Sequence, residues 1–303
     1  MAEETLWRLE HVVLKPRRLQ DVSLTLYRGV TAVIGWSGAG KTSLLNLLAG
    51  FEKPDAGRVM PAASLRIGWV PQNGALWPHC SAREHLTIAT ASRDGADSLL
   101  AEFDLTDRAD AVPHQLSQGE QSRLAVARAL ASRPAVLVLD EPLVHVDPAR
   151  AGKYWRVIRE HMAVTGASLI FSTHVPELVL SEAGRAICLR EGTVLHEGAT
   201  AELYAQPRTP ELMSFLGPGN WLTPEESHLW LGSDAPAERC WRPEQVQIEQ
   251  CEHGAAVVAT ASFGGSVATC ELRHLESATS RTFYHRPTAA VLREGMRVSV
   301  RAV

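Results

Sequence analysis

The most constraining feature of this sequence is a glycine-rich segment between an apolar run and a run with helical spacing. Residues 31–34 read Thr-Ala-Val-Ile, which is typical of a short buried strand. From Ser43 to Ala49, four leucines recur at helical spacing, and the run ends at Gly50. Between the two runs, Gly35–Thr42 matches the pattern G-x-x-x-x-G-K-[ST]. This order of strand, loop and helix predicts an α/β fold.

The glycine-rich loop is suited to hold a phosphate chain. Its backbone is able to curl so that successive N–H groups point at phosphate oxygens, and the following helix adds the positive end of its dipole. We expect Lys41 to reach the β- and γ-phosphates and the Thr42 hydroxyl to bind Mg²⁺. The predicted nucleotide-binding residues of the loop are Gly35, Ser37, Gly38, Ala39, Gly40, Lys41, Thr42 and Ser43.

An acidic pair follows a second apolar run. Val136–Leu139 leads into Asp140 and Glu141, and we expect this strand to lie beside the strand of the phosphate loop. Asp140 is then placed to hold Mg²⁺, usually through water. Glu141 is placed to accept a proton from an attacking water or to orient it, which typically contributes about 10²–10⁴-fold to a rate. The two motifs together predict nucleotide hydrolysis.

Four further segments appear in a fixed order around these motifs. They are Gln72 after Trp-Val-Pro, Leu116–Gln121 with the letters Leu-Ser-Gln-Gly-Glu-Gln, Asp147 after a valine, and Ser172–His174 after an apolar run. The whole set resembles the ATP-binding cassette (ABC) family of ATPases over residues 5 to about 215.

The resemblance implies roles for single residues. Gln72 is expected to sense Mg²⁺ and the γ-phosphate, Asp147 to lie in a loop that crosses to the other monomer, and His174 to hydrogen-bond the γ-phosphate and steady the water. The predicted catalytic residues are Glu141, His174 and Gln72. The predicted Mg²⁺ ligands are Thr42, Gln72 and Asp140.

The Ser-Gln-Gly segment carries the strongest implication of the resemblance. Ser117 and the Gly119 N–H are expected to face a γ-phosphate at the start of a helix over 120–131. In this family that helix completes the site of a second copy, which gives a head-to-tail homodimer with two ATP molecules. Ser117 is also a good N-cap for the helix, and the two readings are compatible.

The sequence departs from the family pattern at two places. Gln118 stands where many members have glycine, and we expect this change to be tolerated because the phosphate contacts are assigned to its neighbours. The stretch from His11 to Arg18 has no aromatic residue to stack on adenine. Trp7 is misplaced for that role, so Arg17 or Pro16 is left as a poor substitute.

Two other segments resemble the importer subgroup of molybdate, sulfate, ferric iron, polyamine and sugar systems. Trp77–Glu84 resembles the stretch on the surface that receives a permease, and Trp241–Glu244 resembles the Arg-Pro-Glu that opens a transport-associated OB-like (TOBE) domain. The expected partners are transmembrane permease subunits and, indirectly, a solute-binding protein. The expected location is the cytoplasmic face of the cell membrane, as a peripheral subunit.

The predicted architecture is a P-loop ABC ATPase domain at 1–219 and a TOBE-like β domain at 220–303. Within the first we expect a helical subdomain at about 73–133. Helices are expected over 82–91, 98–103, 120–131 and 148–164, and C-terminal strands over 246–248, 255–263, 267–272 and 298–300. Short strands with turn signals at this spacing favour a small barrel or sandwich, and the domain is predicted to be an OB-like barrel.

Charge and composition bound the remaining options. The net charge is −4 with no basic block, so nucleic acid is not an expected partner. No apolar run reaches the roughly 20 residues that span a bilayer, and the start of the chain is unlike a signal peptide. The five cysteines are dispersed and favour reduced thiols. A zinc site among Cys240, Cys251, His253, Cys270 and His274 fits no usual ligand spacing, and scattered strand residues are the favoured interpretation.

Two alternatives to an importer subunit are open on the sequence. One is a soluble ABC ATPase that is not coupled to transport, for which a coiled-coil insertion, a zinc hook or a second cassette would be expected. The other is an inactive regulatory module, which Lys41, Asp140, Glu141 and His174 argue against.

Overall fold

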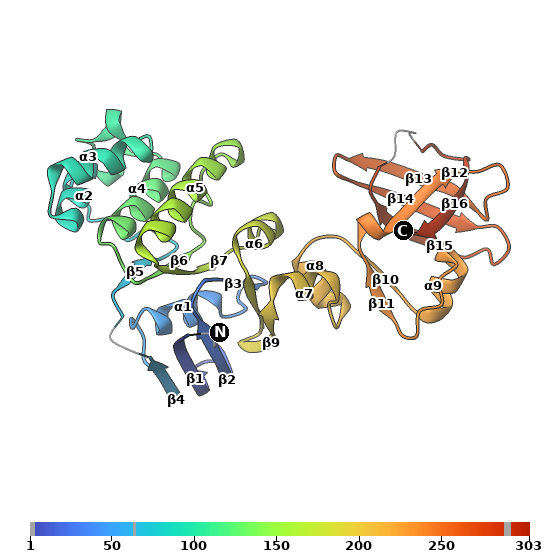
Figure 1. Cartoon of the computed structure of the whole chain (residues 1–303), viewed down its shortest axis with the longest axis horizontal. Coiled ribbons are helices and arrows are strands. Elements are labelled where there is room, and N and C mark those ends of the chain that lie inside the picture. Colours follow the sequence, from blue (N-terminus) through green and yellow to red (C-terminus); the bar gives the residue numbers. More distant parts are fainter. Residues whose placement is uncertain (1–3, 63–64, 288–291) are drawn as a thin grey trace. The chain divides into compact units, whose positions relative to one another are not determined.

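A computed structural model describes residues 4–62, 65–287 and 292–303 of the chain. The chain forms two compact units, Met1–Thr200 and Ala201–Val303 (Figure 1). The units divide after Thr200, before the domain boundary that the sequence predicts near residue 220. Each unit has a hydrophobic core of its own.

The first unit is built around a six-stranded sheet in the order β5-β6-β7-β3-β8-β9. The strands are β3 (Val30–Gly35), β5 (Ile67–Val70), β6 (Val136–Asp140), β7 (Ser168–Ser172), β8 (Arg185–Arg190) and β9 (Thr193–Ala199). The first five are parallel, and only β9 pairs antiparallel, with β8. Every residue of β6 and β7 is buried, as expected for central parallel strands covered on both faces.

The predicted neighbour of the phosphate-loop strand is wrong. We expected β6 beside β3, but β7 lies between them and pairs with both. The chain leaves β6, runs through α5 (Pro148–Thr165) and returns as β7 next to β6 on the β3 side. Asp140 nevertheless reaches the phosphate loop, because the start of α1 lies close to the ends of these strands.

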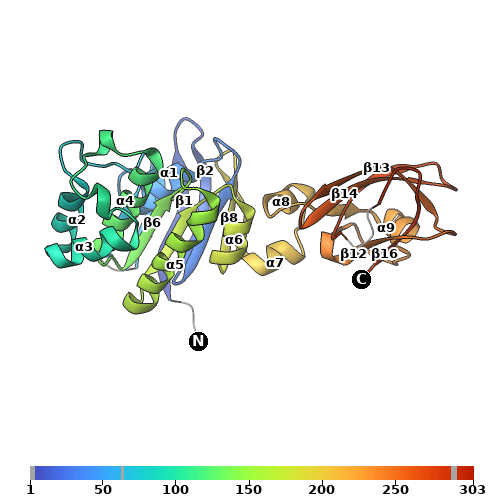
Figure 2. The same cartoon turned by 90° about the horizontal axis from the view of Figure 1, so that it is seen from above.

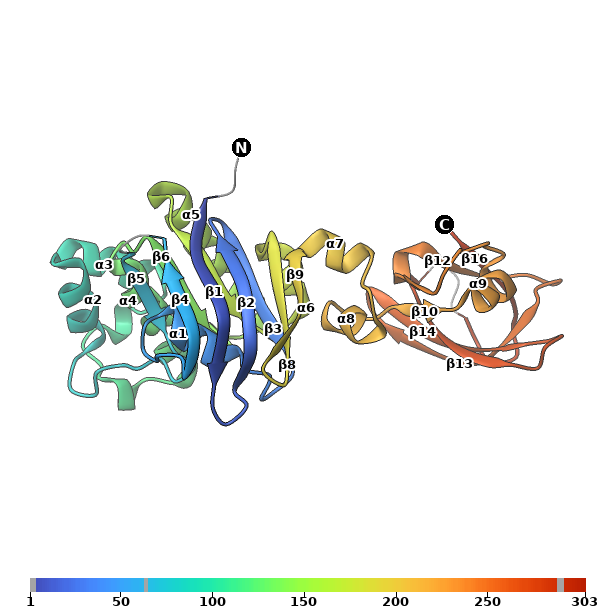
Figure 3. The same ribbon diagram turned by 90° about the horizontal axis from the view of Figure 1, so that it is seen from below.

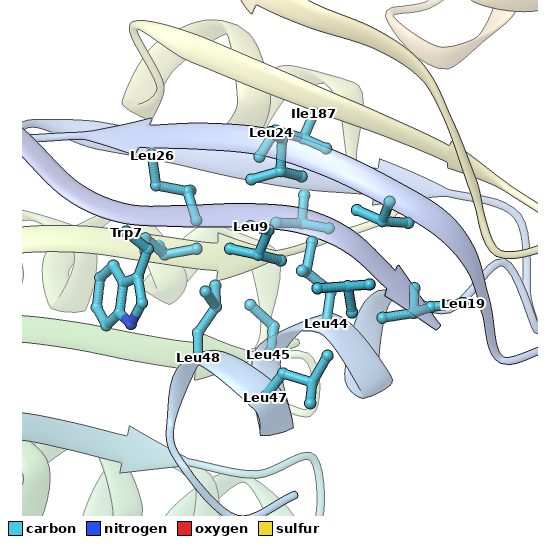
Figure 4. Close-up of a cluster of buried hydrophobic side chains, with 14 of the residues drawn as sticks. Trp7, Leu9, Leu19, Leu24, Leu26, Leu44, Leu45, Leu47, Leu48 and Ile187 are labelled. Atoms are coloured by element: carbon cyan, nitrogen blue, oxygen red, sulfur yellow. The ribbon is translucent and has the colours of Figure 1, made fainter. Parts of the chain in front are cut away.

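A second, antiparallel sheet covers α1 (Lys41–Leu48). Its order is β2-β1-β4, with β1 (Thr5–Leu14), β2 (Leu19–Tyr27) and β4 (Ala56–Pro61). All four leucines of α1 are buried, and Leu45 and Leu48 point towards Trp7 and Leu9 of β1 (Figure 4). The alternation of buried and exposed residues along β2 is the pattern of a sheet with one covered face.

A helical segment lies at one end of the first unit, beside β5 (Figure 1) and β6 (Figure 2). It contains α2 (Ala82–Thr90), α3 (Arg93–Glu102), two short 3₁₀ turns at Thr106–Arg108 and Pro113–Gln115, and α4 (Gln118–Ala131). The predicted helix over 98–103 begins earlier, at Arg93, because Ser92 caps it by accepting the Gly95 N–H. The unit also contains α6 (Pro176–Glu182).

The second unit is mainly β, and a small C-terminal β domain is confirmed. A five-stranded antiparallel sheet has the order β12-β16-β13-β14-β15. Figure 3 labels four of its strands, β12, β13, β14 and β16. Its strands are β12 (Val246–Gln250), β13 (Ala256–Gly264), β14 (Val267–His274), β15 (Ser280–His285) and β16 (Arg297–Ala302). The other elements are α7 (Thr200–Ala205), α8 (Pro210–Phe215), β10 (Asn220–Leu222), α9 (Pro224–Leu231), β11 (Arg239–Trp241) and a 3₁₀ turn at Pro243–Gln245.

Arg242 ties α7 and α8 to the β elements of the second unit. Its guanidinium is 1% exposed and donates to the backbone oxygens of Tyr204, Met213 and Gly217. The same group lies over the Tyr204 ring, with 4.3 Å between the guanidinium carbon and the ring centroid. This arginine belongs to the predicted Arg-Pro-Glu motif, and in the structure it holds loops together.

The cysteines and histidines near the C-terminus lie on separate elements. Cys240 is in β11, Cys270 and His274 are in β14, and Cys251 and His253 are in the turn before β13. Over residues 4–62, 65–287 and 292–303, no three such side chains gather as a metal site. Across the same residues, no helix is both long and apolar enough to span a bilayer.

Candidate nucleotide-binding site

The predicted phosphate loop lines a cavity of about 450 Å³. The loop leaves β3 at Gly35 and enters α1 at Lys41. Gly40 has φ 103°, and a Cβ on it would lie 2.5 Å from the backbone oxygen of Arg18, so only glycine fits this turn. The other residues around the cavity come from distant segments, and they are Arg18, Gln72, Glu141 and His174.

Lys41 is held over the loop by backbone oxygens. Its Nζ donates to the oxygen of Gly35 at 2.9 Å and to that of Trp36 at 3.3 Å. The ammonium therefore lies at the mouth of the curled backbone, beside the free N–H groups at the start of α1. A phosphate at this helix end would meet the positive end of the dipole and a point charge.

A chain of short hydrogen bonds joins Thr42 to the acidic pair. The Thr42 hydroxyl donates to Asp140 Oδ2 at 2.7 Å, and the Ser172 hydroxyl donates to Asp140 Oδ1 at 2.5 Å. Ser172 Oγ in turn accepts the Glu141 N–H at 2.8 Å. Asp140 is 2% exposed, so both of its buried oxygens have a partner, as a buried carboxylate requires.

Ser172 is a site residue without a predicted role. It ends β7 and connects Asp140 with the backbone of Glu141. The available signal was a serine at the end of an apolar strand, in the segment that also supplies His174. Assigning the role needed the position of β7 beside β6, whereas the sequence analysis expected β6 to lie directly beside β3.

Glu141 and His174 lie next to each other at the cavity. His174 Nδ1 lies 3.6 Å from Glu141 Oε2, and both side chains line the cavity with the loop. Glu141 has φ 48°, a left-handed backbone that costs of order 1–3 kcal/mol in a residue other than glycine. Such strain is often found at functional sites, where the surrounding structure holds it in place.

The oxygens of Thr42 and Asp140 suit a hard divalent cation. Mg²⁺ prefers hydroxyl, carboxylate and amide oxygens and keeps several waters. Thr42 and Asp140 are already 2.7 Å apart through their hydrogen bond, and Gln72 lines the same cavity. The donor set therefore fits the predicted metal.

The structure does not bring the Ser-Gln-Gly segment to this cavity. Ser117 is the N-cap of α4, as predicted, and accepts the Glu120 N–H, while Glu120 accepts the Ser117 N–H. A Cβ on Gly119 would lie 2.8 Å from the His145 oxygen. Ser117, Gly119 and Asp147 are absent from the residues that line the loop cavity.

Gln118 of the Ser-Gln-Gly segment and His145, two residues before Asp147, line a smaller cavity instead. It has a volume of about 190 Å³ and is lined by Gln72, Gln118, Glu141 and His145 among others. Asp147 caps α5 by accepting the Ala149 N–H at 2.9 Å. Within one copy of the chain, the exposed Ser117 hydroxyl therefore lies outside the cavity that the phosphate loop lines.

The residues near the phosphate loop show which side chain could stand in for the missing aromatic residue at the adenine. Trp7 is 2% exposed in the core beneath β1, so it is not at the cavity. Arg18, rather than the predicted Arg17 or Pro16, lines the cavity. Its guanidinium pairs with Glu52 at 2.7 Å and donates to the Lys15 oxygen at 2.9 Å.

Comparisons with known proteins agree with this geometry. Residues 19–144 match the ABC transporter family. The Fe(3+) ions import ATP-binding protein FbpC 2 of Pectobacterium atrosepticum is 34% identical over 84% of this chain and 84% of its own length. The sulfate/thiosulfate import ATP-binding protein CysA of Synechococcus elongatus is 35% identical over 76% of this chain and 73% of its own length.

Solved structures resemble the ATPase part of the chain. The dimeric post-hydrolysis state of the ATP-binding cassette MJ0796, bound to ADP and Pi, has a TM-score of 0.57 and 26% identity, and it covers 64% of this chain and 99% of its own. The ATP-binding subunit of an ABC transporter has a TM-score of 0.60 at 23% identity, over 66% and 92%, which shows the fold.

Proposed function

Since this chain belongs to the ABC transporter family as the ATP-hydrolysing subunit of an importer, we propose the residues that carry out the reaction. The loop from Gly35 to Ser43 holds the triphosphate, and Lys41 neutralises its β- and γ-phosphates. The observation that carries the proposal is the convergence of this loop with Gln72, Glu141 and His174 around one cavity.

Glu141 and His174 prepare the attacking water in this proposal. The Glu141 carboxylate accepts a hydrogen bond from the water and orients it in line with the γ-phosphorus. His174, 3.6 Å from Glu141, donates to a γ-phosphate oxygen and steadies the same water. Most of the acceleration of phosphoryl transfer comes from such positioning and from charge neutralisation.

The metal site of the proposal consists of Thr42, Asp140 and Gln72. Mg²⁺ bound there would neutralise charge on the β- and γ-phosphates. Ser172 fixes the Asp140 carboxylate, and Gln72 reports the presence of the γ-phosphate to the segment that follows it.

Ser117, Gly119 and Asp147 act on a second copy of the chain. Their absence from the loop cavity and the exposed start of α4 support a head-to-tail homodimer, in which each copy completes the site of the other. ATP draws the copies together and hydrolysis lets them part. The dimeric form of the similar cassette MJ0796 agrees with this arrangement.

The proposed partners are permease subunits in the membrane and, through them, a solute-binding protein. The chain would then lie as a peripheral subunit at the cytoplasmic face. Residues 220–303 are proposed to be a TOBE-like domain that helps to hold the dimer between cycles. Two similar proteins are named for the import of ferric ions and of sulfate or thiosulfate, and the copurified binding protein would identify the cargo here.

The test is purification of a tagged Glu141→Gln chain from detergent-solubilised membranes of its own host, in the presence of ATP and Mg²⁺. Loss of the water-orienting carboxylate should trap the ATP-bound dimer with its permease. The control adds Lys41→Ala, which should abolish ATP binding and the trapped complex. Recovery of the trapped chain alone, or with ribosomes or DNA, would favour a soluble ABC ATPase that is not coupled to transport.

A further inference from the structure

The segment between Gln72 and α2 is fastened by a buried histidine. His85, in the first turns of α2, is 0% exposed. Its Nε2 accepts the Trp77 N–H at 2.8 Å, and its Nδ1 lies 2.8 Å from the Ser81 oxygen. Because a backbone oxygen only accepts, Nδ1 must carry the hydrogen and Nε2 the lone pair. The bonding therefore requires the neutral imidazole in a single tautomer.

Trp77 connects this histidine to α4. The Trp77 and His85 rings are stacked, with centroids 5.0 Å apart and planes 12° apart. The Arg128 guanidinium of α4 lies 4.9 Å from the Trp77 ring centroid. Trp77 itself is 42% exposed, so one part of it is held while another part faces the outside. We call Arg128, Trp77 and His85 the Trp77 clamp.

Arg128 also holds the turn that contains Gln72. Its guanidinium donates to the Ala75 oxygen at 2.9 Å and to the Gly74 oxygen at 3.0 Å. The Gly74 N–H closes the turn by donating to the Pro71 oxygen at 2.8 Å. Gln72, in the middle of this turn, lines the phosphate-loop cavity. A continuous set of contacts thus runs from the cavity to the exposed edge of Trp77.

We propose that His85 and Arg128 are positioning residues, which join the Gln72 turn, α2 and α4 so that a nucleotide-dependent shift of Gln72 reaches the exposed face at Trp77. The inference deepens the proposed function, because that face is where a permease would sense the nucleotide. Neither His85 nor Arg128 lines the phosphate-loop cavity. His85 and Arg128 determine whether a nucleotide-dependent shift of Gln72 is transmitted along the chain beyond Ala75.

Protonation of His85 would open the clamp. An imidazolium has no lone pair for the Trp77 N–H, and it would bring a second positive charge near Arg128. Burial lowers the pKa of His85, and the Arg128 charge lowers it further, while the Ser81 oxygen and Glu84 act in the opposite direction. From α3, which packs on α2, Asp97 is paired with Arg83 instead. The clamp is therefore closed at neutral pH and opens in acid.

Hydrogen exchange of the full chain tests the proposal. The Trp77 amide is followed near pH 7.5 and near pH 5.5, with rates corrected for intrinsic exchange. His85→Phe keeps an aromatic ring but removes the acceptor, and should speed exchange of this amide about tenfold near pH 7.5. His85→Gln cannot titrate and should remove the acid dependence. His161→Phe, which changes a partly buried histidine of α5, should leave Trp77 unaffected.

A second readout separates positioning from a merely structural role. In the Glu141→Gln background, ATP with Mg²⁺ should change exchange from residue 72 to residue 81 when the clamp is intact. With His85→Phe or Arg128→Ala, the change should stop at residues 72–75. A nucleotide response that still reaches residue 81 in both variants, or acid sensitivity of Trp77 that persists without His85, would overturn the proposal.

Binding of a fluorescent ATP analogue is measured on the same samples. The proposal requires that both clamp variants bind the analogue within about twofold of the Glu141→Gln parent. If the parent does not bind ATP at all, the proposed function fails, whatever the Trp77 amide does. If the parent binds and the clamp variants lose binding, His85 and Arg128 are supports of the site and not positioning residues.

Discussion

Among single residues, Ser172 shows how a site depends on side chains that do not touch the substrate. Its hydroxyl gives a hydrogen to the Asp140 carboxylate and accepts one from the Glu141 backbone. Removing one partner of a buried hydrogen bond costs about 1–3 kcal/mol. Both Asp140, the proposed metal ligand, and the strained backbone of Glu141 rely on this one oxygen.

We predict that Ser172→Ala lowers kcat for ATP by about 10–100-fold, because Asp140 and Glu141 lose their common support. Ser168, at the other end of β7, supplies the matched control. Its hydroxyl accepts the Gly29 N–H at 3.2 Å, far along the strand from the acidic pair. Ser168→Ala should lower the unfolding free energy with little effect on kcat. Equal kcat values for the two variants would contradict the role of Ser172.

Arg18 carries a prediction about nucleotide affinity. Its guanidinium lines the loop cavity and is fixed by Glu52, and a guanidinium stacked on an aromatic ring contributes about 0.5–2 kcal/mol. Arg18→Ala should therefore raise the Kd for a fluorescent ATP analogue by about 2–30-fold. Arg17→Ala, one residue away, should leave it unchanged. If the two variants bind alike, another group contacts the base.

Among the elements, the starts of helices are specified by local sequence, whereas the order of strands in the sheet is not. Ser81, Ser117 and Thr223 form capping boxes with a glutamate three residues later, a local signal that fixes the start of a helix. The order of strands in the sheet is not local. The position of β7 between β6 and β3 depends on the side of β6 to which the chain returns after α5. Hydrophobic periodicity predicts single helices and strands but not this order.

The same distinction applies to the candidate site. The motifs named the loop, Asp140, Glu141, Gln72 and His174 because each follows a strand or a turn in sequence. Arg18 and Ser172 were missed, since their roles arise only when separate strands are brought side by side. His85 had no motif, and its importance depends on two hydrogen bonds to a loop.

One carboxylate, that of Asp104, joins α5 to the loop after α3 and should contribute to acid unfolding of the first unit. The Lys153 ammonium holds the pKa of Asp104 at about 2, and Tyr154 and Arg150 also lower it. The folded pKa is below the ordinary value, so the stabilisation is present above about pH 4 and is lost as pH falls towards 2. Asp104 is partly exposed, so we expect only about 1 kcal/mol from it.

Urea unfolding at pH 7 and pH 3 checks this prediction. Asp104→Asn should lower the unfolding free energy by about 1 kcal/mol at pH 7 and by only about half of that at pH 3, because pH 3 lies between the folded and the ordinary pKa of the carboxyl. Asp107→Asn, in the neighbouring 3₁₀ turn, should change neither value. The same loss at both pH values would show that packing, rather than the carboxylate charge, is responsible.

For the whole molecule, the division into two units means that stability and catalysis are separable. The core of the first unit includes Trp7 and the leucines of α1, while that of the second includes Trp230, Trp241 and Phe283. Arg242 supports the second unit, because the backbone oxygens that its guanidinium contacts belong to that unit. Its guanidinium fork contacts several oxygens that a lysine ammonium cannot reach together.

Arg242→Lys should therefore lower the melting temperature of the second unit alone. We expect a loss of about 2–4 kcal/mol, since several buried backbone oxygens lose their donor, with kcat for ATP unchanged. Differential scanning calorimetry with and without ATP and Mg²⁺ distinguishes the two transitions. Arg239→Lys, which affects an exposed stacked arginine, is the control. A joint shift of both transitions would show that the units unfold together.

The hydrogen bond between Thr42 and Asp140 has a thermodynamic consequence. A hydroxyl that gives its hydrogen to a carboxylate still offers lone pairs to a cation, so the two proposed ligands are ordered before the nucleotide arrives. The entropy of ordering them is lost once, when the chain folds, and not again in every catalytic cycle. Calorimetry should then show a smaller unfavourable entropy for Mg²⁺-ATP binding than in Ser172→Ala, where the carboxylate keeps only the hydrogen bond from Thr42.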